Sequence, residues 1–432
     1  MSNVFYRKLR QRVPRIVRGE GVYLYDDAGK RYLDACGGAM VCSIGHGVAE
    51  VAEALGRQAA QVAYVNGTAF TNEPVEELAS LLARKAPEGL DRAYFLSSGS
   101  EAVEAALKLA RQYHVERGQH QRRVVIAQAP GYHGNTMLAL AASARGHYKA
   151  MFAPWLTDVV MIDAPYPYRR EVDGSALEAA IVQAGAQNVA AFIAEPIGGS
   201  STGASVPARD YFARVREICD RHGVLFICDE VLTGAGRTGK FFGIQHFGVT
   251  PDVITMGKSL NGGYAPLSAL IAKRTIVETI AHGSGGFMHA QTYSHNPLSA
   301  AAGLAVQHYV EKRDLVERAA RVGEKLGARL KRIENEIVGD VRGIGMLWAI
   351  EFVADGRTKR AFPREDALAE RLVENAKDLG LVLWPNVGHA DGRNGDLVMI
   401  APPFTITEEQ IEELATLLER SIAQTSQRRI PA

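Results

Sequence analysis

The feature that most limits the fold of this sequence is a series of short, almost wholly apolar runs between about residues 70 and 310. Helical patterns such as "PVEELASLLARKA" and "SEAVEAALKLARQYHVE" separate them. Short apolar runs with helices between them are typical of strands buried on both faces, as in parallel sheets. The runs are "RVVIAQ", "AAFIAEP", "GVLFICDE", "DVITMG" and "LSALIA". We therefore expect an α/β fold with a mostly parallel central sheet covered by helices.

The two ends of the chain have a different pattern. Near the N-terminus, "GVYLYDDAGKRYLDA" contains two alternating runs around a polar turn, which predicts a β-hairpin. After residue 315, long amphipathic helices flank the strand patterns "VRGIGMLWAIEFV" and "LVMIAP". A chain of 432 residues usually needs more than one hydrophobic core. We predict a large domain over 66–315 and a smaller α+β domain built from 1–65 and 316–432.

Composition excludes several classes of function. The formal net charge is +1, which argues against nucleic acid or an anionic membrane as a partner. No run of 18 apolar residues predicts a membrane span. The four cysteines form no CxxC pair, and no metal-ligand motif is present, so we expect no metal and a reducing cytoplasm. A basic arm precedes the first acid; it contains Arg7, Lys8, Arg10, Arg12, Arg15 and Arg18.

Ser98, Gly99 and Ser100 follow a predicted strand and begin a helix in "YFLSSGSEAVEAALKLAR". The free N–H groups and hydroxyls at such a helix N-terminus form a site for an anion. An ordinary N-cap explains the same residues, because serine before glutamate is common capping chemistry. On this pattern alone both interpretations stay open.

The loop "APGYHGNT" follows another predicted strand and places Tyr132 and His133 between two glycines. An aromatic ring at a loop tip is suited to stack on a planar ligand. A tyrosine packed under a turn is the simpler interpretation of the same residues.

Two carboxylates end two further apolar runs, Glu195 in "AAFIAEP" and Asp229 in "GVLFICDE". Ligands of open α/β sheets bind outside the carboxyl ends of the strands. A carboxylate at that place is shielded from water and needs a positive partner. The alternative for Asp229 is a helix cap or an ion pair with Arg237.

Lys258 follows the run "DVITM" and is surrounded by glycines in "GKSLNGG". A phosphate-binding P-loop is excluded, because its first glycine would have to stand where Asp252 does. A surface lysine fits poorly at the end of a buried strand. A lysine in a partly desolvated cleft favours its neutral form, which condenses with an aldehyde.

Taken together, these segments resemble the class III aminotransferases, which are pyridoxal-phosphate (PLP) enzymes of fold type I. The resemblance covers almost the whole chain, from "GEGVYLYDDAGKRYLD" to "APPFTITEEQ". Its motifs stand in family order; they are "SSGSEAVEAALKLAR", "GYHGNT", "AEPIGG", "CDEVLTGAGRTGK" and "TMGKSLNGG".

The resemblance implies a role for each matching residue. Lys258 would bind the cofactor as a Schiff base, and Asp229 would pair with the pyridine nitrogen. Tyr132 and Val231 would cover the two faces of the ring, and Thr292 would reach the phosphate of a neighbouring subunit in a homodimer. Further cofactor contacts are implied at Ser98, Gly99, Ser100, His133 and Glu195.

The implied reaction is a ping-pong transfer of an amino group from an amine or ω-amino acid to a keto acid, commonly pyruvate or 2-oxoglutarate. Aminomutases, decarboxylases and racemases use the same cofactor and scaffold and remain alternatives. A non-catalytic binding protein with this fold is a third one, disfavoured because both Lys258 and Asp229 are present.

Departures from the family pattern bear on the substrate. Met399 stands where relatives acting on amino-acid α-carboxylates carry an arginine. ω-Transaminases instead use an arginine on a glycine-rich loop just upstream, which makes Arg393 the candidate for binding a substrate carboxylate. An ordinary loop arginine that faces solvent is the alternative for Arg393. Tyr64 and Phe70 are candidates to line the substrate pocket, with core packing as their alternative.

Overall fold

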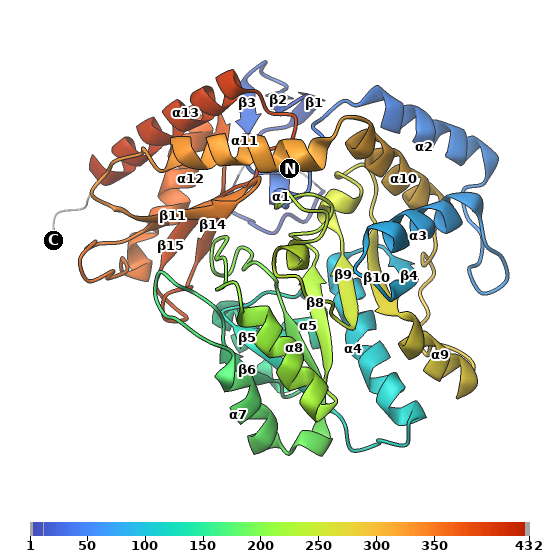
Figure 1. The fold of residues 1–432 in the computed structure, drawn as a ribbon. Coiled ribbons are helices and arrows are strands. Elements are labelled where there is room, and N and C mark those ends of the chain that lie inside the picture. Colours follow the sequence, from blue (N-terminus) through green and yellow to red (C-terminus); the bar gives the residue numbers. More distant parts are fainter. Residues whose placement is uncertain (1–2, 12, 428–432) are drawn as a thin grey trace.

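The computed structural model describes residues 3–11 and 13–427. Arg12 of the basic arm and the outermost residues of the predicted small domain, 1–2 and 428–432, lie outside the described residues. Figure 1 shows the orange and red C-terminal helices beside the blue N-terminal strands, with the large sheet and its helices below them. In the described part of the chain, none of the helices is both long enough and apolar enough to cross a membrane.

The largest sheet has seven strands in the order β4-β10-β9-β8-β7-β5-β6. All of its pairings are parallel except those of β10, which runs antiparallel to both neighbours. The mostly parallel sheet is therefore confirmed, and the run "LSALIA" forms the antiparallel strand β10. Only a short loop joins β9 to β10, whereas a parallel pair needs a longer crossover. The strands are β4 (Leu90–Leu96), β5 (Val124–Ala129), β6 (Val160–Asp163), β7 (Val189–Ala194), β8 (Leu225–Glu230), β9 (Val253–Met256) and β10 (Ser268–Lys273).

Both faces of this sheet are buried under helices. Successive side chains of a strand point to opposite faces. Phe192 of β7 and Phe226 of β8 accordingly join one apolar cluster, whereas their neighbours Ile193 and Ile227 join another. The first cluster includes helices α3 (Glu73–Lys85), α7 (Ser175–Ala184) and α8 (Tyr211–His222). The second includes α4 (Gly99–Glu116), α5 (Met137–Ala142) and α9 (Arg274–His282).

The two chain ends build a second unit together. A four-stranded sheet, β1-β2-β3-β13, joins the predicted N-terminal hairpin to the C-terminal part through parallel pairing of Leu33 with Leu381. A separate antiparallel sheet has the order β11-β12-β15-β14. The strands are β1 (Ile16–Glu20), β2 (Tyr23–Asp26), β3 (Arg31–Asp34), β11 (Val338–Ile344), β12 (Leu347–Phe352), β13 (Leu381–Val382), β14 (Trp384–Val387) and β15 (Asp396–Ile400).

Helices from both chain ends complete this unit. Val22 and Leu33 near the N-terminus share one apolar cluster with side chains of α11 (Leu315–Leu330), α12 (Leu368–Asp378) and α13 (Glu408–Gln427). The remaining helices are α1 (Gly37–Met40), α2 (Ala49–Gln61), α6 (Gly146–Phe152) and α10 (Pro297–Lys312). The exact limits of the two predicted domains stay a prediction.

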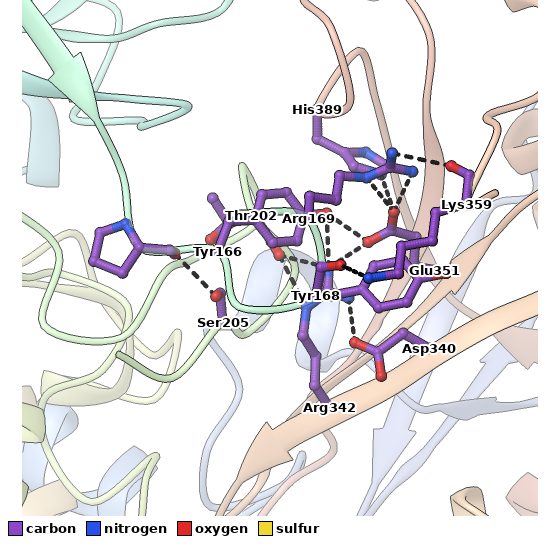
Figure 2. A network of polar contacts seen from close by, with 11 residues as sticks. Tyr166, Tyr168, Arg169, Thr202, Ser205, Asp340, Arg342, Glu351, Lys359 and His389 are labelled. Carbon is purple, nitrogen blue, oxygen red and sulfur yellow. Dashed lines mark hydrogen bonds and ion pairs between the residues drawn. The ribbon is translucent and has the colours of Figure 1, made fainter. Parts of the chain in front are cut away.

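A buried polar network connects the large sheet to the C-terminal sheet (Figure 2). Its centre is Glu351 of β12, whose side chain is fully buried. Glu351 accepts hydrogen bonds from Arg342 of β11 at 2.8 Å and from Arg169 of the loop after β6 at 2.7 Å. Tyr166 donates to the same carboxylate, and Nε2 of His389 lies 3.4 Å from it. Segments far apart in the sequence are thus joined through one carboxylate.

Candidate active site

The topology of the large sheet brings the predicted site residues to one edge. Strands β4, β5, β7, β8 and β9 all run in the same direction, so their carboxyl ends meet there. A cavity of about 190 Å³ lies at this edge. It is lined by Gly99, Ser100, Tyr132, His133, Gly134, Glu195, Ser200, Asp229, Val231, Leu232 and Lys258. A larger groove between α2, α3 and α10 contains none of the predicted site residues.

Lys258 is the cation of this cavity. It directly follows β9 with φ of +45°, a left-handed conformation that is uncommon outside glycine and is found preferentially at functional sites. Burial lowers the pKa of Lys258. Among the described residues, no carboxylate forms an ion pair with it. The strand end therefore presents a lysine whose neutral form is favoured, next to space for a ligand.

Asp229 stands at the end of β8 and is held by three donors. Its Oδ2 lies 2.7 Å from Nδ1 of His133, and its Oδ1 accepts from the hydroxyl of Thr255 and the N–H of Val231, each at 3.0 Å. Burial acts to lower the pKa of His133, but the hydrogen bond and charge of Asp229 outweigh it, so that the pKa is raised. His133 is thereby placed as a partner of Asp229, a relation that the sequence pattern did not predict.

The alternative ion pair between Asp229 and Arg237 is wrong. Arg237 is fully buried, and its guanidinium donates to three backbone carbonyls, those of Met346, Ala401 and Pro402. These carbonyls belong to the C-terminal unit, so Arg237 ties the Gly-rich loop after β8 to that unit.

The N-terminus of α4 is both an ordinary N-cap and part of the cavity wall, so neither of the two interpretations left open by its sequence excludes the other. Ser98 is the N-cap and forms a capping box with Glu101, so its hydroxyl is occupied by the helix itself. Ser100, by contrast, lines the cavity and exchanges hydrogen bonds with Asn135. A side chain at Gly99 would bring its Cβ to 2.6 Å from Val231, so close packing requires glycine there.

Tyr132 and Glu195 form another wall of the cavity. The N–H of Tyr132 donates to Oε1 of Glu195 at 3.1 Å, and the N–H of Gly199 donates to Oε2 at 2.8 Å. Burial raises the pKa of Glu195. Both oxygens of Glu195 are therefore engaged in holding the two loops that carry Tyr132 and Ser200.

Besides the capping residue Ser98 and the exposed Phe70, three further predicted residues lie outside this cavity. Thr292 is exposed, and Tyr64 is 46 % exposed with its ring centroid 6.1 Å from that of Tyr293. The side chain of Arg393 is 76 % exposed and forms an ion pair with Glu365 at 3.6 Å. Met399, at the position of the missing arginine, is fully buried in an apolar cluster.

Sequence reasoning missed Ser200 and Arg145. Ser200 lines the cavity, and Arg145 donates a hydrogen bond to it. The guanidinium of Arg145 also lies over the ring of Tyr132, 4.6 Å from its centroid. Arg145 is in a loop without a motif, so no local pattern marks it, whereas Ser200 directly follows the motif "AEPIGG", which could have drawn attention to it.

The residues at this edge fit pyridoxal 5'-phosphate. The N-terminus of a long helix, with Gly99 and Ser100, suits the phosphate. The carboxylate of Asp229 suits a protonated ring nitrogen, and Tyr132 offers an aromatic face. The Nζ-bearing side chain of Lys258 borders the same cavity, as a covalent anchor for the aldehyde requires.

Comparisons with known proteins agree with this chemistry. The family profile for class III aminotransferases matches residues 6–422. The aminotransferase YodT of Bacillus subtilis is 40 % identical over 96 % of each chain. The putrescine–pyruvate aminotransferase of Pseudomonas aeruginosa is 35 % identical, over 98 % of this chain and 93 % of its own.

A solved structure extends the agreement to the fold. The PLP-bound amine transaminase from an uncultivated Pseudomonas species has a TM-score of 0.89 and 34 % identity, covering 98 % of this chain and 97 % of its own. The fold is thus that of the fold type I PLP transaminases. The chain belongs to the class III aminotransferases, enzymes that depend on pyridoxal 5'-phosphate.

Proposed function

We propose that this aminotransferase moves an amino group from an amine or ω-amino acid to a keto acid, pyruvate or 2-oxoglutarate, in two successive half-reactions. The observation that carries the proposal is Lys258, a lysine with a lowered pKa at the end of β9 that borders the same cavity as Asp229. The name of the P. aeruginosa relative, which pairs a diamine with pyruvate, supports the same classes of donor and acceptor.

Lys258 is the proton carrier in this proposal. When bound, PLP supplies an electron-poor ring that accepts the electron pair released at the substrate carbon. The neutral amine of Lys258 would take the proton from that carbon and return it to the carbon on the other side of the transferred nitrogen, as general base and then as general acid. Burial favours this role, because it lowers the pKa of Lys258 towards neutrality.

The other residues of the cavity would hold the cofactor and orient it. Asp229 would keep the ring nitrogen protonated, and His133 and Thr255 fix the carboxylate of Asp229 in place. Tyr132 and Val231 would cover the two ring faces, and Gly99 and Ser100 would hold the phosphate. Glu195 positions the loop of Tyr132 through the main chain.

We also propose a homodimer in which Thr292 reaches the phosphate of the partner subunit. The loops around Thr292 support it, because several large apolar side chains there are exposed in the single chain. They are Tyr64, Phe70, Met288 and Tyr293, between 46 % and 68 % exposed. Exposed apolar patches of this kind mark protein interfaces. A cytoplasmic location, expected from four free cysteines, stays a prediction.

One set of experiments tests the proposal. Purified protein should be yellow with bound PLP, and borohydride reduction should fix the cofactor on Lys258, as peptide mass spectrometry would detect. Amine donor and pyruvate together should yield alanine, with neither substrate sufficient alone. An aminomutase would need no second substrate, a decarboxylase would release carbon dioxide, and a racemase would only invert its substrate. Any of these results, or a label on another residue, would refute the proposal.

A further inference from the structure

Arg145 is a cation of the active site that the motifs do not account for. It lies in the loop between α5 and α6, with its guanidinium over the ring of Tyr132 and hydrogen-bonded to the hydroxyl of Ser200. Both of these contacts line the cavity that contains Lys258. The charge of Arg145 also acts on Lys258, whose pKa it helps to lower.

Among the residues that the structure describes, Arg145 forms no ion pair, although the charge of Glu195 acts on it. Glu195, the acid of the cavity whose charge acts on Arg145, uses both oxygens for the N–H groups of Tyr132 and Gly199. Nε of Arg145 is buried and lacks a hydrogen-bond partner among the described residues. Burial lowers the pKa of Arg145, as expected for a desolvated cation.

Such an arrangement is costly unless an anion arrives with a ligand. A desolvated charge without a partner destabilises the folded protein, and an unsatisfied buried N–H adds to that cost. A guanidinium presents its N–H groups as a planar fork that matches a carboxylate. The stacked ring of Tyr132 and the hydroxyl of Ser200 hold this fork in one orientation.

Arg393, which the sequence suggests as the carboxylate-binding residue, lies in solvent, unlike Arg145. Its side chain is 76 % exposed and is already paired with Glu365. Neither arginine lines the two cavities that border Lys258, but Tyr132 and Ser200, which contact Arg145, line one of them. Its loop does lie against the residue that follows Arg145, since the carbonyl oxygen of Gly392 is 3.7 Å from the place of a Cβ on Gly146. The two arginines thus lie on neighbouring loops, Arg145 against two residues that line the cavity and Arg393 in solvent.

We propose that Arg145, rather than Arg393, binds the carboxylate of the keto acid acceptor and of the amino acid formed from it. The proposal rests on the proposed transaminase function and specifies its acceptor site. An amine donor without a carboxylate makes no use of this contact. Arg145 is thus a specificity-determining residue that distinguishes the carboxylate-bearing substrate from the simple amine.

The test compares holoenzymes of wild type, Arg145→Gln, Arg145→Lys and Arg393→Gln. The KM for pyruvate is measured at saturating monoamine, and the KM for the monoamine at saturating pyruvate. Calorimetry gives the Kd of propionate, an unreactive three-carbon carboxylate, independently of turnover. We expect Arg145→Gln to raise the pyruvate KM and the propionate Kd by about 10- to 100-fold, the strength of a charge-assisted contact.

The controls decide between the two arginines. The monoamine KM of Arg145→Gln should change by less than about threefold, Arg145→Lys should restore part of the carboxylate affinity, and Arg393→Gln should leave all three constants near those of wild type. The inference is wrong if Arg145→Gln leaves the pyruvate KM and propionate Kd unchanged, if it raises both KM values equally, or if Arg393→Gln alone weakens carboxylate binding.

Cofactor absorption and the borohydride label on Lys258 do not depend on Arg145. Their loss in wild type would instead refute the proposed function.

Discussion

Two regions of this protein enclose charged side chains, and they do so in opposite ways. In the network that joins the two units, Glu351 is surrounded by donors from Arg342, Arg169 and Tyr166 (Figure 2). Burial acts to raise the pKa of Glu351, but its contacts with His389 and the two arginines outweigh this and lower it. In the cavity at the edge of the large sheet, Lys258 has no ion-pair partner in the described chain, and burial lowers its pKa.

The comparison indicates that the charge of Glu351 has a structural role and that the charge of Lys258 has a chemical one. A carboxylate saturated with hydrogen bonds stays ionised and fixes the geometry of the segments around it. A lysine without a counter-ion changes protonation easily and is available to a ligand. Paired charge in the network should therefore govern stability, and unpaired charge in the cavity should govern activity.

The largest expected effect is that of Lys258→Met. Activity should fall by about 10⁴-fold, the upper range for loss of a general acid–base group, because the covalent anchor is lost as well. The free energy of unfolding of the cofactor-free protein should not fall, because an unpaired charge is removed from a desolvated place. Turnover assays and urea denaturation measure the two quantities, with the exposed Lys240→Met as control. A variant that is strongly destabilised but still active would show that Lys258 serves stability rather than activity.

Next in size is Glu351→Ala in the network. Removing one partner of a buried ion cluster leaves the other charges uncompensated, so the free energy of unfolding should fall by about 3–5 kcal/mol. Turnover per folded enzyme should stay within a few-fold of wild type. Glu365→Ala, which breaks the exposed pair with Arg393, should change the unfolding free energy by less than about 1 kcal/mol. Equal effects of the two substitutions would remove the distinction between buried and exposed pairs.

The smallest expected effect concerns pH. Burial lowers the pKa of His389 below its ordinary value of 6.5. Below pH 6.5 the unfolded chain therefore binds a proton that the folded protein does not, and stability falls as pH falls. One such group contributes at most about 1.4 kcal/mol per pH unit. His389→Gln should thus flatten the decline of the unfolding free energy between pH 6.5 and 5, measured by urea denaturation. If the slope of the unfolding free energy against pH is unchanged in His389→Gln, groups other than His389 cause the loss of stability in acid.

Much of the fold could be predicted because its signals are local. The alternation of apolar runs and helical patterns predicts β5, β7, β8 and β9 with their direction, since covered runs of this kind form parallel sheets. Strand ends of one direction meet at one edge, so the positions of Asp229 and Lys258 followed from the same pattern. The direction of β10 did not follow, because it depends on the connection from β9, which contains no α-helix to carry the chain back for a parallel strand.

The pattern of residues along the chain therefore specifies the type of sheet, the residues at its carboxyl edge and the family that carries them. Which side chains meet at that edge depends on the folded arrangement. Asp229 is held by His133 instead of Arg237, and Arg145 reaches Tyr132 and Ser200 while Arg393 faces solvent. The physical reason is that strand patterns arise from burial along one segment. Contacts between loops, by contrast, depend on how packed helices and strands place distant segments beside one another.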